Sequence, residues 1–414
     1  MKRIFLLLTL IGGLVSCFQQ RRQSAMLFRD INPKDFVADS LSVLGLKEGK
    51  AIKIQVHEFD ENHYVMMREL FDTVYAVPLE TTDSSLIGVI DKIVVYDNCI
   101  YVLDRYKTKS LKRFSLDGKY LNAVGRWGEG PDYYWEPTDF CISEGEIFLL
   151  DQFQGKIFRY SPDGLLNSSV RIPFFCTEFY RFGENSYVFH GVDADNYHFP
   201  EILDYSLWQT DSNFVVHTMS MYRKKDKYIP YLQKNTLACY NGSVYYRKSL
   251  GDTIYSLTPD GEVFCDYILD FQDKAMPQRL LEKENEREFD KEANERSNYA
   301  FMDGYAITPD YIYANCSLNK LVYHLFYNLS SCKVWLASVF PNDINYFFPF
   351  RIPVGAVDNT LIGYVQAYEI YEDFHKVSEK AWAEIPEKKR REIFATCENL
   401  KMEDNPIVLF YVLK

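Results

Sequence analysis

The sequence lacks the short motifs by which common hydrolases, nucleotide-binding enzymes and zinc proteases are recognised. It contains no G-x-S-x-G, no G-x-x-x-x-G-K-[ST] and no H-E-x-x-H. The nearest approach is His57-Glu58, which is followed by Glu61 where the second histidine of a zinc protease would stand, and His63 comes too late. No catalytic residue can be assigned on this basis. We therefore expect a binding protein rather than an enzyme.

Paired cysteines are also absent. The nine cysteines form no C-x-x-C pair, and most of them stand inside apolar runs such as Asn98-Cys99-Ile100. A dense disulfide framework and a cysteine metal site are therefore not expected, and buried free thiols are. Cys316 and Cys332 flank one predicted hairpin, which leaves a disulfide between these two open.

Metal ligands are thinly scattered. The seven histidines are spread over the chain, and the only tight cluster combines Asp193, Asp195 and His198. Oxygen ligands at alternate positions are typical of the start of a calcium loop, but the later glycine and bidentate glutamate of such a loop are missing. We expect a solvated loop here, and we predict neither a metal site nor a cofactor.

The sequence also has no excess of positive charge. The formal net charge is −12, which provides no electrostatic basis for gripping phosphate backbones and argues against a nucleic-acid partner. Aromatic residues, in contrast, are abundant, with 32 tyrosines and 30 phenylalanines. This composition favours strands over helices and supports a large buried core.

The first residues have the pattern of a secretory signal. Lys2-Arg3 precedes an apolar run, residues 4–15, that is too short to span a bilayer stably. The run ends in Leu14-Val15-Ser16-Cys17, which resembles the lipobox of bacterial lipoproteins. The resemblance implies cleavage of a signal peptide, residues 1–16, and anchoring to the membrane through lipid on Cys17. A plain secretory signal with an unrelated cysteine is the alternative.

Residues 71–414 are organised by a repeated unit. Each copy has an apolar run, a short polar gap, an alternating run and an Asp-Gly turn, which is the pattern of a strand followed by a hairpin. The two clearest copies consist of residues 100–104, 110–114 and Asp117-Gly118, and of residues 147–151, 156–160 and Asp163-Gly164. With Asp211-Ser212 and Asp260-Gly261, the turns recur at spacings of 46, 48 and 49 residues. Units of this length hold four short strands.

This spacing predicts an all-β fold, a six-bladed β-propeller. Two helical insertions, residues 278–297 and 378–400, lengthen the later copies, and in the second a helix is expected to begin near Pro386. Without the insertions, roughly 300 residues remain, which make six units of about 48. An open array would leave unpaired strand edges, so we expect residues 73–77 to close the last blade by pairing beside residues 407–413.

The start of the repeats, Val77-Pro78-Leu79-Glu80-Thr81-Thr82 with Leu86-Ile87-Gly88, resembles the six-bladed β-propeller lipoproteins common in gut Bacteroidetes. The segment Gly125-x-x-Gly128-x-Gly130-Pro131 is similar to the NHL repeat. The likeness covers residues 73–270 well and departs in the third unit, where residues 187–190 lack the aspartate that ends the strand. It implies the propeller fold and a location in the cell envelope.

The resemblance also bears on localisation and activity. Residues 17–70 are predicted to form a lipid-anchored tether and an N-terminal extension, with a strand at residues 51–56. The tether lacks the acidic cluster that marks surface export in the lipoproteins it resembles, so we expect an outer membrane lipoprotein that faces the periplasm rather than the cell surface. Some NHL-like propellers are lyases or lactonases with a channel metal, but no histidines stand at matching positions here.

The link between the first two units, residues 125–137, is predicted to carry the ligand site. In a propeller such a link crosses one face and reaches the channel mouth, and glycines permit its turns. It holds four aromatic residues within nine positions, of which Tyr134 matches the NHL aromatic that wedges between blades. The others, with polar flanks, would form a platform for a sugar ring or a peptide side chain: Arg126, Trp127, Glu129, Tyr133 and Trp135. Packing of some of these aromatics between blades is the alternative.

Asp104 and Asp151 end equivalent strands in neighbouring units. An aspartate in that place usually accepts hydrogen bonds from nearby backbone N–H groups. We therefore predict that the two carboxylates cap turns and do not act as an acid–base pair.

Three classes of function remain after these exclusions. The first is a lipid-anchored binding protein of the cell envelope that takes a small ligand, glycan or peptide at the channel mouth. The second is an NHL-like metal-dependent hydrolase or lyase. The third is a structural subunit of an envelope complex that binds a protein partner with its flat faces.

Overall fold

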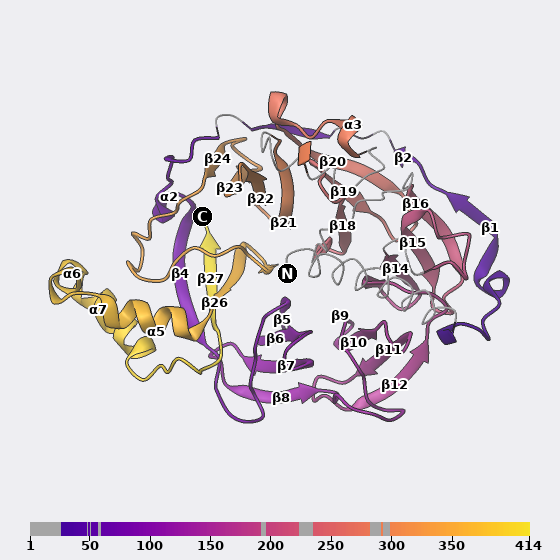
Figure 1. Cartoon of the computed structure of the whole chain (residues 1–414), viewed down its shortest axis with the longest axis horizontal. Helices are drawn as coiled ribbons and strands as arrows, with labels where there is room; N and C mark the ends of the chain where they lie inside the picture. Colours follow the sequence, from indigo (N-terminus) through magenta and orange to yellow (C-terminus); the bar gives the residue numbers. More distant parts are fainter. Residues whose placement is uncertain are drawn as a thin grey trace, which may run out of the picture.

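The computed structural model describes residues 26–47, 49, 51–56, 59–191, 196–222, 235–281, 291–292 and 299–414. Over these residues the strands form six sheets arranged in a ring about one axis, which is a six-bladed β-propeller (Figure 1). Each blade is an antiparallel meander with its first strand at the axis and its last strand at the rim. The all-β, six-bladed prediction is confirmed.

The first three blades follow one another along the chain. Blade 1 holds β5 (Lys92–Tyr96), β6 (Cys99–Asp104), β7 (Ser110–Ser115) and β8 (Tyr120–Val124). Blade 2 holds β9 (Asp139–Ser143), β10 (Glu146–Asp151), β11 (Lys156–Tyr160) and β12 (Leu166–Arg171). Blade 3 holds β13 (Glu178–Phe182), β14 (Ser186–His190), β15 (Tyr205–Asp211) and β16 (Val216–Tyr222).

The other three blades complete the ring. Blade 4 holds β17 (Leu237–Tyr240), β18 (Ser243–Arg247), β19 (Thr253–Leu257) and β20 (Val263–Asp270). Blade 5 holds β21 (Phe301–Ile307), β22 (Tyr311–Leu318), β23 (Leu321–Asn328) and β24 (Val334–Ala337). Blade 6 holds β25 (Gly355–Val357), β26 (Thr360–Val365), β27 (Ile407–Leu413) and, from the other end of the chain, β4 (Phe71–Pro78).

The ring closes through β4, as the sequence predicted. β4 pairs with β27 in antiparallel register, so that Val77 lies opposite Val408 and Val74 opposite Tyr411. The side chains of Phe71, Val74 and Val77 are buried in the core on either side of the blade. Hydrogen bonding and apolar burial together therefore hold the two ends of the propeller.

The Asp-Gly turns that mark the repeat are contacts between blades. Gly118 and Gly164 have φ values of 88° and 78°, in the left-handed region that glycine adopts readily. A Cβ atom on Gly118 would lie 2.1 Å from the carbonyl oxygen of Pro78, and one on Gly164 would lie 2.1 Å from that of Ala123. Each turn thus packs against the outer strand of the preceding blade, which leaves no room for a side chain.

Blade 3 has the same turn with a phenylalanine in place of the glycine. The Phe214 N–H donates to the Asp211 carbonyl oxygen over 3.1 Å, as the Gly118 N–H donates to the Ser115 carbonyl over 2.9 Å. Phe214 therefore takes the glycine position, with a φ of 63°, two residues after the turn that Asp211-Ser212 predicted. Its ring is buried beside Tyr187, and this packing compensates the strained backbone.

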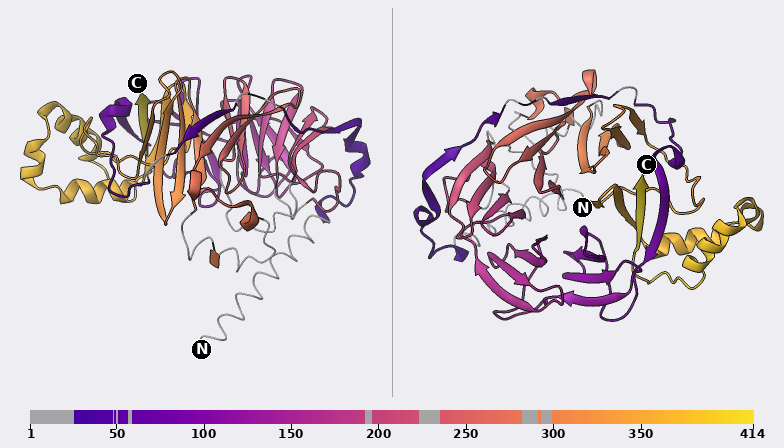
Figure 2. Two further views of the ribbon diagram at one scale, coloured as in Figure 1. Left: turned by 90° about the horizontal axis from the view of Figure 1, so that it is seen from above. Right: turned by 180° about the vertical axis from the view of Figure 1, so that it is seen from behind.

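The N-terminal segment wraps around the outside of blades 3 and 4 (Figure 2). After a 3-10 turn (Pro33–Phe36), β1 (Val37–Val43) adds a fifth, parallel strand to β16. β2 (Leu46–Lys47) and β3 (Ile52–Gln55) do the same on β20. β3 confirms the strand predicted at residues 51–56. These additions cover two sheet edges that would otherwise be open.

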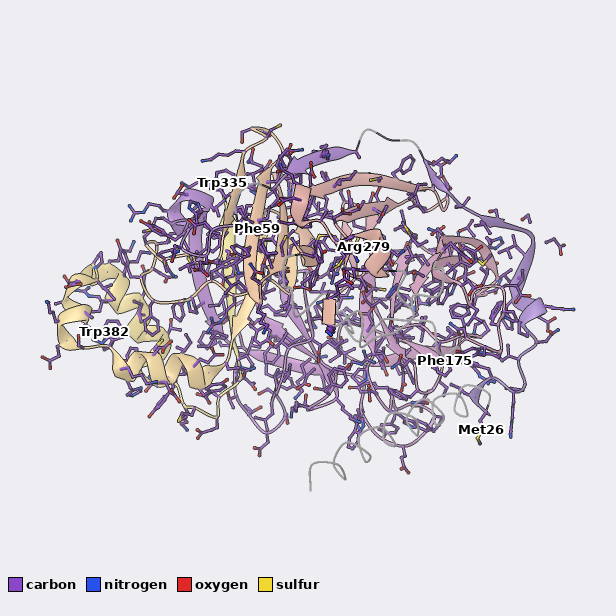
Figure 3. All side chains as sticks on the ribbon, turned by 45° about the horizontal axis from the view of Figure 1, so that its top comes forward. Met26, Phe59, Phe175, Arg279, Trp335 and Trp382 are labelled. Carbon is purple, nitrogen blue, oxygen red and sulfur yellow. The ribbon has the colours of Figure 1, made fainter. Side chains whose placement is uncertain are left out.

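The second helical insertion stands out from blade 6 at the edge of the disc (Figure 1). It contains α5 (Ala367–Lys376), α6 (Glu379–Glu384) and α7 (Glu387–Cys397). Pro386 is the N-cap of α7, as predicted, but the insertion begins at residue 367 rather than 378. Trp382 lies among these helices and packs on Phe374 and Phe394 (Figure 3).

The first insertion is described only in part. α3 (Gln278–Leu281) begins where residues 278–297 predicted a helix, and most of the remaining insertion lies outside the described residues. A further short helix, α2 (Met67–Leu70), leads into β4, and a second 3-10 turn (Gln272–Lys274) follows β20. Within the described ranges, no helix is long and apolar enough to cross a membrane.

The cysteines agree with the prediction of free thiols. All eight that the structure describes are free, and five of them are buried. Cys316 is buried in β22, whereas Cys332 is exposed in the turn after β23. The disulfide that the sequence left open between them is therefore not formed.

Candidate functional site

A cavity of about 950 Å³ lies at the centre of the ring. All six blades contribute to its wall, chiefly through their inner strands, and most of the lining side chains are apolar or aromatic. Representatives from successive blades are Ile93, Phe140, Phe179, Leu237, Ala306 and Ala356. Sites for small molecules usually enclose about 300–1,000 Å³ and have mostly apolar walls, so this cavity has the size and character of a ligand site.

Charged residues begin the inner strands of three consecutive blades, and one of them, Lys92, lines the cavity. Lys92, Asp139 and Glu178 are each the first residue of the inner strand in three consecutive blades. The Lys92 ammonium donates to Asp139 Oδ1 over 2.7 Å and to the Phe140 carbonyl over 2.8 Å. Burial lowers the pKa of Lys92, but the carboxylates of Asp139 and Glu178 raise it by more. The ammonium is therefore held in its charged form.

Glu178 joins blade 3 to blade 4. Its carboxylate accepts hydrogen bonds from the Thr236 and Leu237 backbone N–H groups, over 3.1 and 2.8 Å, and from the Thr236 hydroxyl over 2.9 Å. Its charge also acts on Arg247, a fully buried residue at the end of β18. Arg247 stands where Asp104 and Asp151 end the second strands of blades 1 and 2.

Asp303, on blade 5, is a further charged residue in the cavity wall. It lies at a register shift between Met302 and Gly304, which makes it the extra residue of a β-bulge. Such bulges re-aim a side chain, and here Asp303 lines the cavity. Its carboxylate accepts a hydrogen bond from the Ser317 hydroxyl. Burial raises its pKa above the usual value, although Ser317 and Arg247 lower it.

Two thiols also line the cavity. Burial raises the pKa of Cys141 to about 12 and raises that of Cys239 as well. Because only the thiolate is a nucleophile, both groups behave as small apolar side chains at neutral pH. The chemistry of the cavity wall therefore consists of apolar contact, charge and hydrogen bonding.

The residues predicted from the link at 125–137 lie outside this cavity. Trp127 and Trp135 are 60% and 50% exposed, Arg126 and Glu129 are exposed, and Tyr133 is half-buried. The link is folded back on itself, because the Gly128 N–H donates to the Tyr134 carbonyl and the Tyr134 N–H donates to the Arg126 carbonyl, each over 3.1 Å. Both tryptophans are thus held on the surface, and ligand binding by these five residues stays a prediction.

Tyr134 has the structural role that the sequence predicted for it. Its side chain is 1% exposed and packs in a cluster shared by blades 1 and 2, with Leu111 and Phe158 among its members. Burial raises the pKa of its hydroxyl well above the usual range. It is the wedge between these blades.

Two further aromatics near the tryptophans were missed by the sequence reasoning. Tyr106 and Phe153, in the loops after β6 and β10, are 49% and 38% exposed. The Phe153 and Trp135 backbone N–H groups both donate to the Asp151 carboxylate, over 2.9 and 2.6 Å. Because strands alternate in direction, these loops and the link emerge on the same face. An aromatic residue two positions after each strand-ending aspartate was the available signal.

Asp104 and Asp151 are turn caps, as predicted. The Asp104 carboxylate accepts from the Gly88, Val89, Lys107 and Thr108 N–H groups and from the Thr108 hydroxyl. The Asp151 carboxylate accepts from four backbone N–H groups and from the Gln154 side chain. Each carboxylate binds both the link that precedes its blade and the loop after the second strand of that blade. These hydrogen bonds give both aspartates a structural role.

The predicted solvated loop around residues 193–198 is only partly described. Asp193 and Asp195 lie outside the described residues. His198 Nε2 lies 2.8 Å from the Pro173 carbonyl oxygen, and the ring stacks on Phe28 at 4.4 Å. In the described part of the chain, no group of three or more His, Cys, Asp or Glu residues is placed to hold a metal. The hydrolase or lyase alternative therefore gains no ligand set from these residues.

A smaller hollow of about 390 Å³ lies between blades 5 and 6. Its wall includes Phe340, Phe350 and the buried His324, whose Nδ1 lies 2.8 Å from the Tyr313 hydroxyl. Burial lowers the pKa of His324 to about 4, so the imidazole is neutral at physiological pH. This ring acts as a polar core residue that holds Tyr313.

The cavity residues could not be assembled from one motif, because they come from the inner strands of all six blades. One signal was present, in that Lys92, Asp139 and Glu178 each open an inner strand. A charge at the first residue of an apolar strand, repeated in register, is unusual for a buried position. This pattern can be recognised in the sequence only if the six repeats are aligned with one another to within one residue.

Comparison with known proteins adds a family and a fold. A family model described as a domain of unknown function, DUF4934, matches residues 50–412. No curated protein matches the chain. A protein from Bacteroides fragilis to which export is ascribed is similar in structure, with 18% identity and a TM-score of 0.66 over 88% of this chain and 100% of that one. At this identity the likeness shows the fold.

Two more distant structures have TM-scores below 0.5. A member of the DUF4221 family from Bacteroides vulgatus has 9% identity and a TM-score of 0.49 over 83% of this chain and 97% of its own. Virginiamycin B lyase from Staphylococcus aureus has 12% identity and a TM-score of 0.35, over 66% of this chain and 76% of its own. Likenesses at this level carry no argument about function.

Proposed function

The chain belongs to the DUF4934 family, and on the geometry of its central cavity we propose that it is a lipid-anchored binding protein of the cell envelope. The observation that carries the proposal is a cavity of about 950 Å³ walled by all six blades, with mostly apolar and aromatic sides and a few charged side chains, Asp91, Lys92 and Asp303. Such a combination provides affinity through apolar contact and orientation through a few polar groups. The ligand class is a small organic molecule.

Filling the cavity tests this proposal. Ala356 lines the cavity and is exposed to it, so Ala356→Trp should place an indole in the ligand's space. We expect it to weaken binding of N-phenyl-1-naphthylamine, a neutral fluorescent probe for apolar sites, at least about tenfold, as the loss of most apolar contact implies. The matched control is Ala383→Trp on the exposed surface of α6, which should bind the probe like the parent chain.

The aromatic surface on blades 1 and 2 is a second candidate. Trp127 and Trp135 expose half or more of their area, and exposed indoles flanked by charges suit stacking on a sugar ring or a peptide side chain. The double variant Arg126→Ala/Trp127→Ala shows, in the same fluorescence titration, whether the probe binds at this surface or in the central cavity. Unchanged probe binding is expected. Loss of binding there, with normal binding by Ala356→Trp, would move the site to the surface.

The envelope location is part of the proposal. Leu14-Val15-Ser16-Cys17 has the pattern of a lipobox, and export is ascribed to the structurally similar Bacteroides fragilis protein. Lipid on Cys17, in two or three acyl chains, would give firm anchoring, with the propeller in the periplasm at the outer membrane. A protein partner in the envelope, which would use the flat faces, is compatible with this location.

Replacing the lipidated residue tests the anchor. We expect Cys17→Ser to shift the protein from the membrane pellet to the soluble fraction after cell lysis, because a chain without acyl groups has little membrane affinity. The replacement Cys332→Ser, at an exposed thiol in a turn, serves as the control and should stay in the pellet. Pelleting of both variants would contradict the anchor.

A further inference from the structure

The exposed tryptophans are concentrated on blades 1 and 2. All five tryptophans lie in the described residues, and of these only Trp127 and Trp135 are exposed. With the exposed Tyr106 and Phe153 they make up the aromatic surface on blades 1 and 2. None of these four side chains lines the central cavity. Single exposed apolar residues are common, whereas a group of them rimmed by polar residues marks a site of interaction with a protein or a membrane.

Backbone contacts hold the members of this surface together. Trp127 forms a parallel β-bridge with Tyr134, the residue before Trp135. The Asp151 carboxylate accepts from the backbone N–H groups of both Trp135 and Phe153, over 2.6 and 2.9 Å. The link at residues 125–137 and the loop after β10 therefore present their aromatics side by side.

Ion pairs connect the fourth aromatic to the same link. Arg105 and Lys109, on either side of Tyr106 in the loop after β6, both pair with Glu136, over 3.4 and 3.8 Å. Glu136 directly follows Trp135 in the link. Exposed charges of both signs flank the aromatics: Lys107, Arg126, Glu129 and Asp132. Aromatic rings with hydrated polar neighbours are suited to the boundary between water and an apolar phase.

The chain leaves the propeller beside this surface on its way to Cys17. Phe28 packs against Gly155, two residues after Phe153, where a Cβ atom would lie 3.1 Å from the Phe28 ring. Met26, at the margin of the propeller in Figure 3, is the first described residue and is exposed. The nine residues that begin at Cys17 and precede Met26 span at most about 30 Å when fully extended. Lipid on Cys17 would therefore keep this part of the propeller close to the bilayer.

We propose that the aromatic surface on blades 1 and 2 rests on the bilayer that holds the lipid anchor, with Trp127 and Trp135 in the headgroup region. Tryptophan and tyrosine concentrate at membrane–water interfaces because their rings are apolar while their N–H and O–H groups are polar. The inference rests on the lipid anchor of the proposed function, and it goes further because it identifies the side of the propeller that meets the membrane.

Quenching of tryptophan fluorescence by brominated lipid tests this contact. The acylated chain is reconstituted into phosphatidylcholine vesicles that are either plain or brominated on the acyl chains near the headgroup, where bromine quenches only indoles that reach it. We expect brominated vesicles to lower the emission of the parent chain. Trp127→Phe/Trp135→Phe should abolish this loss. The matched control Trp382→Phe, at a half-buried tryptophan of α6, should retain it.

Flotation of the vesicles on a density gradient separates this inference from the anchor. A chain that does not float with the vesicles overturns both. A chain that floats but has equal emission in plain and brominated vesicles overturns the membrane contact alone, and this is the result that a soluble glycan or peptide ligand on the same surface predicts. Quenching that persists in Trp127→Phe/Trp135→Phe also overturns it. If the double variant does not fold, Trp127→Phe alone, which should reduce the loss of emission, takes its place.

Discussion

A chain shortened to begin at Glu80 is expected to be insoluble or unfolded, because it has lost the outer strand of blade 6. β4 is the only described strand that pairs with the free edge of β27. It also buries Phe71, Val74 and Val77. At about 2 kcal/mol for each of these side chains, the loss is of the same order as the entire free energy of unfolding of a typical domain, about 5–15 kcal/mol.

A chain that begins at residue 60 provides the matched comparison. It keeps β4 but loses β1 to β3, which only add parallel strands to the rims of blades 3 and 4. We expect it to fold cooperatively with a lowered melting temperature, because Ile54 and Val56 leave the core. Thermal melting by circular dichroism measures both chains. Equal melting temperatures for the two would disprove closure through β4.

The second large effect is expected at the buried ion pair between blades 1 and 2. Lys92→Met leaves the Asp139 carboxylate buried without its cation, which typically costs about 3–5 kcal/mol. The matched control is Lys376→Met, which breaks an exposed pair with Glu372 of similar length, 2.7 Å, and should cost less than about 0.5 kcal/mol. Urea unfolding at pH 7 measures the free energy of unfolding of both variants.

The double variant Lys92→Met/Asp139→Asn separates the effect of the unpaired Asp139 charge from the effect of losing the lysine side chain. Asparagine keeps a carbonyl oxygen for the Phe179 N–H, which donates to Asp139 over 3.0 Å, while it removes the unpaired charge. We therefore expect the double variant to be more stable than Lys92→Met alone. The ion pair would be shown to have no structural role if Lys92→Met cost no more than Lys376→Met.

The closed ring adds a candidate ligand site that differs from the one predicted from the sequence. The link at residues 125–137 is the predicted ligand site because its aromatic residues stand close together in the sequence. The structure places those residues outside the cavity, which lies at the centre of the ring between the inner strands, so the two sites need separate tests. Spacing along one segment predicts a local platform, whereas a channel is a property of all six blades.

The sequence by itself determined the features that arise from local interactions and from repetition. The period of the Asp-Gly turns specified the blades, because a glycine such as Gly118 is required where a turn touches the preceding strand. The apolar run at residues 407–413 needed a partner, which identified β4 as the clasp. Pro386 marked the start of a helix. Each of these follows from hydrogen bonding or steric limits within a few residues or one strand pair.

Only the tertiary structure decided what surrounds the axis. Lys92 and Asp303 are far apart in the chain, and they line one cavity only because the ring closes and the inner strands converge. The bulge that makes Asp303 a cavity residue is a shift of one residue in register between β21 and β22, and that register is set only when the two strands pair.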